Sequence, residues 1–224
     1  KLSKSKNWSI SLKGFTRDFD PDYLRFYLSS IIPFSQSDIN FDWDTFYEKI
    51  NNELISNIGN FVNRTLTFTM KQFRGIVPSP ETFDSTDIKI LNELKTVAFE
   101  VGDLIYNNQI DKAMKEILRV SSLFNQFFQS KEPWKSPTSA NNTIWISING
   151  VRSMSILLYP FIPKSAAKIW DQLGMHEELS TQNWYQASSP IIKGGHKISN
   201  HIAPIFTRIE KDEIERLKSN QTKD

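Results

Sequence analysis

Two polar residues four positions apart, Asn60 and Arg64, could together contact a flat ligand that forms hydrogen bonds. On a helix this spacing places both side chains on one face, one turn apart, and Thr67 and Lys71 continue the same stripe. An amide offers a donor and an acceptor, and a guanidinium offers a planar fork of donors. Such a pair could contact the edge of an unstacked base in a single-stranded RNA loop. The spacing alone favours a simpler interpretation, a solvated helix flank on which Arg64 meets a carboxylate of a neighbouring helix.

Trp134 is a second residue that could bind a nucleic acid. It lies in the tetrapeptide Glu-Pro-Trp-Lys, directly after a predicted helix, and Lys131 and Lys135 make the segment basic. An exposed indole there could stack on a base, which contributes about 1–3 kcal/mol to binding. A tryptophan after a proline at a helix junction more often fills the core. We also expect Lys71, Lys131 and Lys135 to contact phosphates if the chain binds RNA.

The third candidate is the pair of lysines in the opening pentapeptide KLSKS, Lys1 and Lys4. Two ammonium groups on a loop could stabilise the charge that develops on a pyrophosphate leaving group, because lysine acts as a compact point charge. A lysine–serine stretch by itself is more often a solvated surface segment.

Composition restricts the classes of protein and site that remain. The 224 residues have a net charge of only +2, so nucleic-acid binding would need a local basic or aromatic patch. There is no cysteine and there are three scattered histidines, which argues against disulfides and against a metal site. No apolar run reaches the roughly 20 residues that a membrane span requires. The chain starts without Met inside a motif-like stretch, so we expect a piece of a longer protein.

The elements that must position these residues are nearly all helical. Asp20 before Pro21 predicts a helix start, and that helix ends before Pro33. Asp42 can cap a long helix that runs to Phe73, with apolar residues at three-to-four spacing: Ile50, Leu54, Ile58, Phe61 and Phe68. Further helices are predicted over 88–105, 111–128, 143–158, 164–172 and 210–218.

The segments between these helices are expected to be irregular. Apolar residues alternate over a short stretch of residues 6–16, which predicts a strand or a loop. Residues 131–143 are expected to be a loop, and residues 175–209 lack a periodic pattern of apolar residues. The predicted fold class is all-α: an antiparallel helix bundle with a short N-terminal segment and an irregular C-terminal segment that packs back on the bundle. We expect two parts, residues 1–40 and residues 41–224.

The order of several segments resembles one family of enzymes. KLSKS followed by FDPDYLRFYLSSIIP resembles the KMSKS signature of class I aminoacyl-tRNA synthetases and the segment after it, with Leu2 in place of the usual Met. DINFDWDTFYEKINNELISNIGNFVNRTL resembles the start of the anticodon-binding bundle of the methionyl-tRNA synthetase family. The EPW tripeptide, FIPKSAAKIWDQLG, and the tail GHKI…PIFTRIEKDEIE match that family in order, so the resemblance covers essentially the whole chain.

The resemblance implies roles for the residues singled out above. Asn60 and Arg64 match helix positions that contact anticodon bases, and Trp134 matches the tryptophan on which the first anticodon base stacks. Lys1 and Lys4 match the catalytic signature lysines, and Lys4 is also the residue that would contact ATP. The partner would be the CAU anticodon loop of tRNA(Met), and the chain would need no membrane.

The family also implies what the whole enzyme does and what this chain lacks. The whole enzyme would be a cytoplasmic, ATP-dependent methionine–tRNA ligase that uses ATP with Mg²⁺ and L-methionine. The HIGH signature, the methionine pocket and the zinc-binding insertion of the family are missing from the sequence, so the chain alone is expected to be catalytically inactive and to bind no metal. Two alternatives remain at this point: the equivalent bundle of a leucine, isoleucine, valine or cysteine enzyme, or a non-catalytic helical interaction module.

Overall fold

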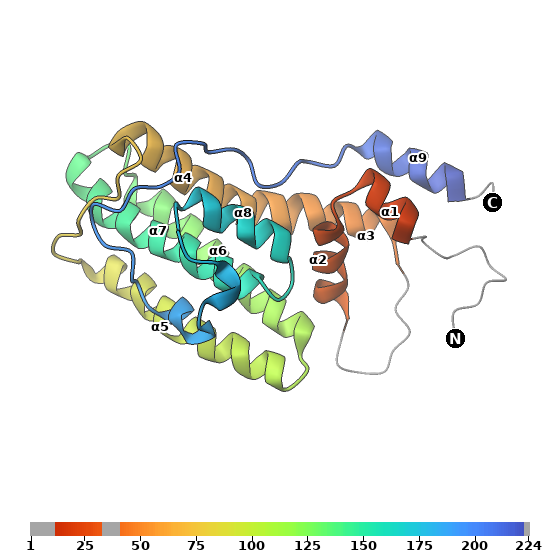
Figure 1. The fold of residues 1–224 in the computed structure, drawn as a ribbon, viewed down its shortest axis with the longest axis horizontal. Coiled ribbons are helices and arrows are strands. Elements are labelled where there is room, and N and C mark those ends of the chain that lie inside the picture. Colours follow the sequence, from red (N-terminus) through yellow and green to blue (C-terminus); the bar gives the residue numbers. More distant parts are fainter. Residues whose placement is uncertain (1–11, 33–40, 222–224) are drawn as a thin grey trace.

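The computed structural model describes residues 12–32 and 41–221, and within them the chain is an all-α helix bundle (Figure 1). The predicted fold class is confirmed. Helices α5, α6 and α7 pack along one another, α4 packs on α6 and α7, and α8 packs on α7. The elements are α1 Leu12–Asp18, α2 Pro21–Ile31, α3 Trp43–Glu48, η2 Lys49–Gly59, α4 Asn60–Phe73, α5 Ser85–Tyr106, α6 Ile110–Lys131, α7 Pro137–Leu158, α8 Pro163–Gln172, η3 Leu179–Thr181, η4 Trp184–Ser188 and α9 Lys211–Gln221.

Short polar side chains cap three helix starts, of which those at Asp20 and Asp42 were predicted and that at Asp84 was not. Asp20 accepts a hydrogen bond from the backbone N–H of Asp22, and Pro21 occupies the first turn of α2. Asp42 caps α3 in the same way through the N–H of Thr45. Asp84 forms a reciprocal capping box with Asp87 at the start of α5. These side chains satisfy N–H groups that have no partner within their own helix, which fixes the residue at which each helix begins.

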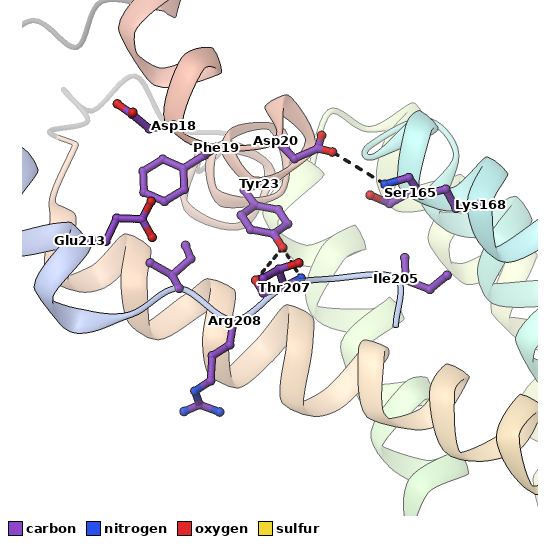
Figure 2. Close-up of a pocket in the computed structure, with 11 residues that line it drawn as sticks. Asp18, Phe19, Asp20, Tyr23, Ser165, Lys168, Ile205, Thr207, Arg208 and Glu213 are labelled. Carbon is purple, nitrogen blue, oxygen red and sulfur yellow. Dashed lines mark hydrogen bonds and ion pairs between the residues drawn. The ribbon is translucent and has the colours of Figure 1, made fainter. Parts of the chain in front are cut away.

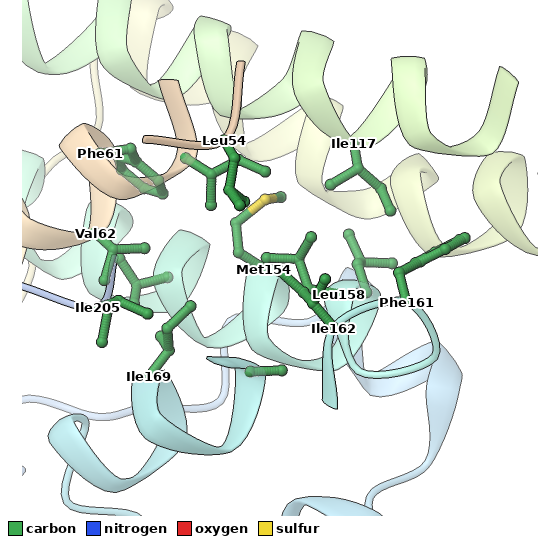
Figure 3. Packing of buried hydrophobic residues seen from close by; sticks show 14 of the residues in the cluster. Leu54, Phe61, Val62, Ile117, Met154, Leu158, Phe161, Ile162, Ile169 and Ile205 are labelled. Carbon is green, nitrogen blue, oxygen red and sulfur yellow. The ribbon is translucent and has the colours of Figure 1, made fainter. Parts of the chain in front are cut away.

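The long helix predicted up to Phe73 is continuous from Trp43, but its middle section differs from a regular α-helix. Residues 49–59 form a wider π-helical stretch, η2, between α3 and α4. Leu54 on η2 and Phe61 on α4 are fully buried, as predicted. Figure 3 shows them among side chains of the neighbouring helices, with Ile205 of the C-terminal segment in the same core. Phe68, which was also predicted to be core, is only partly buried and lies at the edge of a cleft.

The C-terminal segment packs back on the bundle, as predicted, and polar side chains hold its backbone. Tyr23 Oη donates to the carbonyl of Thr207 and accepts from its N–H, both at 2.8 Å. Asn51 forms the same kind of pair with Ile209, at 2.9 and 3.0 Å. Gln172 does so with Ala203. Each of these side chains supplies a donor and an acceptor to one residue of the segment, and further back Lys197 forms an antiparallel bridge with Ile76.

Two local predictions are wrong. The expected strand or loop near the N-terminus is a helix where it is described, α1, because Phe15 and Phe19 lie one helical turn apart and both pack on Phe46, with ring centroids 5.5 and 5.6 Å away. The expected loop over 131–143 is much shorter. Helix α6 runs to Lys131, and α7 begins at Pro137 after an extended Ser136, a Ser-Pro helix start that the sequence contains.

Candidate nucleic-acid interface

Asn60 and Arg64 occupy the first turns of α4, and both contact α6. Asn60 Nδ2 donates to Asn125 Oδ1 at 2.9 Å. The Arg64 guanidinium lies 4.2 Å from the centre of the Phe128 ring, and it makes a longer contact of 3.4 Å with Gln129 Oε1. Asn60 is exposed and Arg64 is half-buried. The structure therefore places both residues on one face of α4, as their spacing predicts.

The carboxylate partner expected for Arg64 on a solvated flank does not occur. Among residues 12–32 and 41–221, no Asp or Glu lies within ion-pair distance of this guanidinium. Burial lowers the pKa of Arg64, yet an arginine in a protein stays protonated. A half-buried positive charge without a carboxylate is thus held over an aromatic ring, where it can still donate hydrogen bonds outward.

Trp134 lies in the short connection between α6 and α7, and 48% of its surface is exposed. It is therefore not a core residue. Its ring borders a cleft of about 450 Å³. The cleft is walled by aromatic, amide and small side chains of α4, the connection and α7: Phe68, Gln72, Phe73, Pro133, Ala140 and Asn141.

Aromatic rings connect Arg64 to Trp134. The Phe128 ring beneath Arg64 packs edge-on against Phe68, with centroids 5.7 Å apart. Phe68 in turn lines the cleft beside Trp134. Packed rings, the buried Phe128 and the partly buried Phe68, therefore lie between the candidate residues, which belong to the surface made by α4, the C-terminal half of α6 and the connection. Such a surface offers donors, an acceptor and an exposed ring face, which together fit an unstacked base.

Lys131 anchors the connection that carries Trp134. Its Nζ lies 2.7 Å from carboxylate oxygens of both Asp84 and Asp87, and its side chain is 11% exposed. Asp87 is buried and also accepts from Asn142 Nδ2 at 3.1 Å. Burial alone would lower the pKa of Lys131, but the hydrogen bonds to the two carboxylates outweigh it and raise the pKa above its ordinary value. This ion-pair cluster joins the ends of α5, α6 and α7.

The cluster changes the prediction about phosphate contacts. Lys131 is already neutralised by two carboxylates and largely covered, so the structure argues against it as a phosphate ligand. Lys71 is exposed on the last turn of α4, and Lys135 is exposed beside Glu132 at 2.8 Å. These two lysines remain as candidates.

Several residues of the surface were not found by sequence reasoning. Asn125 and Gln129 contact Asn60 and Arg64 from α6. They repeat the same four-residue spacing of polar residues, and this was the signal available in the sequence. It was missed because the predicted helix ended at 128, before Gln129. Lys1 and Lys4 lie outside the described residues, and their role stays a prediction.

A second hollow, of about 300 Å³, lies where α2 meets α8 and the C-terminal segment (Figure 2). Its lining carries both acidic and basic side chains, and Asp20 lies 2.8 Å from Lys164 and 4.0 Å from Lys168. The mixed charges make it a poor match for a polyanion. In the described part of the chain, no three His, Asp or Glu side chains gather closely enough to hold a metal ion. No helix there has the length and apolar character that crossing a membrane requires.

Comparison with known proteins identifies the family. The family model described as tRNA synthetases class I (M) matches residues 1–66, and the one described as the anticodon binding domain of methionyl tRNA ligase matches residues 77–222. This chain belongs to the methionyl-tRNA ligase anticodon-binding family. The resemblance seen in the sequence is thereby confirmed, and the alternatives of another class I enzyme and of an unrelated helical module are set aside.

Curated relatives agree with this family assignment, and a solved structure shares the fold. The methionine–tRNA ligase of Nanoarchaeum equitans is 46% identical over 74% of this chain and 21% of its own length. That of Pyrococcus abyssi is 36% identical over 96% of this chain and 29% of its own length. The apo methionyl-tRNA synthetase of Mycobacterium tuberculosis shares the fold with a TM-score of 0.80 at 24% identity, covering 87% of this chain and 40% of that one. The chain thus spans only about a fifth to a third of the curated relatives named here.

Proposed function

We propose that this chain reads the CAU anticodon of tRNA(Met) through Asn60, Arg64 and Trp134. The observation that supports the proposal is a series of contacts: Arg64 lies over the buried Phe128 ring, Phe128 packs on Phe68, and Phe68 lines the cleft beside the exposed Trp134. Trp134 supplies a stacking platform for the first anticodon base, and the amide and guanidinium of α4 contact the edges of unstacked bases. The aromatic cleft beside Trp134 gives such a base room to leave the stack.

The whole enzyme to which the chain would belong is a methionine–tRNA ligase. It would join L-methionine to tRNA(Met) in the cytoplasm, using ATP as a reactant together with Mg²⁺. Residues 1–40 would carry the signature loop, in which Lys1 and Lys4 stabilise charge during adenylation and Lys4 contacts ATP. Residues 41–224 would form the anticodon-binding part. Each part has a counterpart among the family matches, which cover residues 1–66 and 77–222 and so meet at a later position than residue 40.

Replacing Trp134 by alanine tests the stacking role. We expect the Trp134→Ala variant to bind a CAU stem-loop about 1–3 kcal/mol more weakly, because each base–aromatic stack contributes that much. The melting temperature should stay nearly unchanged, since half of the indole is already in solvent. Binding is measured by titration of a labelled stem-loop, and stability by thermal unfolding of the same preparation.

Tyr106→Ala is the matched control, because Tyr106 is 87% exposed at the end of α5, outside the proposed surface. It should leave both binding and stability unchanged. The proposal for Trp134 is wrong if Trp134→Ala lowers the free energy of unfolding by several kcal/mol while the folded fraction binds the stem-loop as well as the wild type does.

A further inference from the structure

Three side-chain amides, those of Asn57, Asn125 and Asn60, are joined by hydrogen bonds between η2, α6 and α4. The orientation of each amide follows from the orientation of the one before it, starting at Asn57. Asn57 Nδ2 donates to the backbone carbonyl of Leu118 at 2.9 Å and to Ser122 Oγ at 2.9 Å. A carbonyl oxygen can only accept, so the nitrogen of this amide must face Leu118. The oxygen of Asn57 is therefore turned towards Asn125.

The groups around Asn125 fix the orientation of its side-chain amide in the same way. Its Nδ2 donates to the backbone carbonyl of Asn57 at 3.0 Å, to that of Ser121 at 3.3 Å and to Asn57 Oδ1 at 3.2 Å. Turning the amide over would set its oxygen against two carbonyl oxygens and the Asn57 oxygen, which is an arrangement of acceptors only. Asn125 Oδ1 therefore points away from these groups and towards Asn60.

The exposed end of this series of amides is Asn60, and its orientation follows. Because Asn125 offers only an oxygen there, Asn60 must present its Nδ2, and the two atoms lie 2.9 Å apart. Asn60 Oδ1 is then the free end of the amide. Among residues 12–32 and 41–221, we find no group that donates to it. One turn further along α4, Arg64 offers only donors.

We propose that Asn125 is a positioning residue that holds Asn60 with its acceptor oxygen towards the bound RNA, so that Asn60 selects a base carrying an exocyclic amino group. This inference rests on the proposed anticodon-binding function. An acceptor on Asn60 beside the donors of Arg64 complements the Watson–Crick edge of cytosine, which presents an amino donor next to two acceptors. Adenine presents an amino donor next to one acceptor, whereas uracil and guanine place a keto oxygen where the amino group would be.

The test measures binding ratios of the full chain for RNA stem-loops that differ in the Watson–Crick edge of one base. The loops carry CAU, UAU or CIU, where U replaces the amino group of cytosine by oxygen and inosine does the same for adenine, and in both the neighbouring ring nitrogen changes from an acceptor to an N–H donor. We expect the wild-type chain to prefer CAU over at least one of the other loops. Asn125→Ala should reduce that preference by roughly tenfold, because a freed Asn60 amide can turn over and donate to the keto oxygen.

Ser122→Ala is the matched control on the same helix. It removes one partner of Asn57 but leaves the Leu118 carbonyl, so the orientation of the amides and the binding ratio should both persist.

A second variant tests whether the effect of Asn125→Ala is purely structural. The double variant Asn60→Asp/Asn125→Ala carries an acceptor-only side chain at position 60, so it should regain the preference for CAU even though its added negative charge weakens binding to every loop.

The outcomes separate the two proposals. If the wild-type chain does not distinguish the loops, the proposed anticodon function itself fails, and this inference fails with it. If the wild type distinguishes them and Asn125→Ala keeps the full ratio, the anticodon function stands and the positioning role is overturned. The positioning role is also overturned if Asn125→Ala loses the preference for the CAU loop and the double variant does not regain that preference.

Discussion

The Asp87→Ala variant should lose about 3 kcal/mol of its free energy of unfolding. Breaking a buried ion pair by removing one partner typically costs about 3–5 kcal/mol, because the remaining charge stays buried. Lys131 would keep its contact with Asp84, which places the expected loss at the lower end of that range. The change also strips Asn142 of a buried acceptor and α5 of half of its capping box. Chemical denaturation followed by circular dichroism measures the loss.

Asp44→Ala is the control for this measurement. Asp44 forms a shorter ion pair, at 2.6 Å to Lys218, but both side chains are exposed. An exposed pair contributes between about 0 and 1 kcal/mol. Asp44→Ala should therefore lose less stability than Asp87→Ala, although its ion pair is the shorter one. If Asp87→Ala costs no more than Asp44→Ala, the cluster around Lys131 is not the anchor of the connection that carries Trp134.

The Leu54→Ala variant should lose about 2–5 kcal/mol, because Leu54 is fully buried and its removal leaves a cavity. For a domain of this size, the loss corresponds to a fall in melting temperature of roughly 4–20 °C. Thermal unfolding measures it directly. Ile88→Ala serves as the control, since Ile88 is a branched aliphatic residue that is 50% exposed on α5, and its truncation should change stability by no more than about 0.5 kcal/mol. Equal shifts for the two variants would mean that the apolar face of η2 does not form the core.

Helix positions were predictable from the sequence where a strong local signal exists. Asp20 with Pro21 and Asp42 have the residue types that a helix start needs, and each does cap a helix. The wide π-helical stretch over 49–59 was not predictable, because its apolar residues repeat at a spacing that an α-helix also satisfies. The early start of α7 at Pro137 was missed although Ser136 and Pro137 carry the same signal as Asp20 and Pro21.

The candidate site was predictable only in part for a similar reason. The spacing of Asn60 and Arg64 places them on one face of a helix, but nothing local shows that this face meets α6. The amide direction imposed by Asn57 and Asn125 depends on carbonyls of another helix, which only the packed structure brings together. The exposure of Trp134 likewise follows from the ends of α6 and α7 and not from its neighbours in the sequence.

The central claim is that this chain recognises a CAU anticodon, and titration of the chain with two stem-loops tests it most directly. One loop carries CAU and the other differs from it only in the first anticodon base. Both are measured at the same salt concentration, because phosphate contacts alone bind RNA without regard to sequence. We expect the CAU loop to bind more tightly by about 1–3 kcal/mol, which is the discrimination that one well-formed set of base contacts provides. Equal affinity for the two loops would contradict the assignment of Asn60, Arg64 and Trp134 as the anticodon-reading residues.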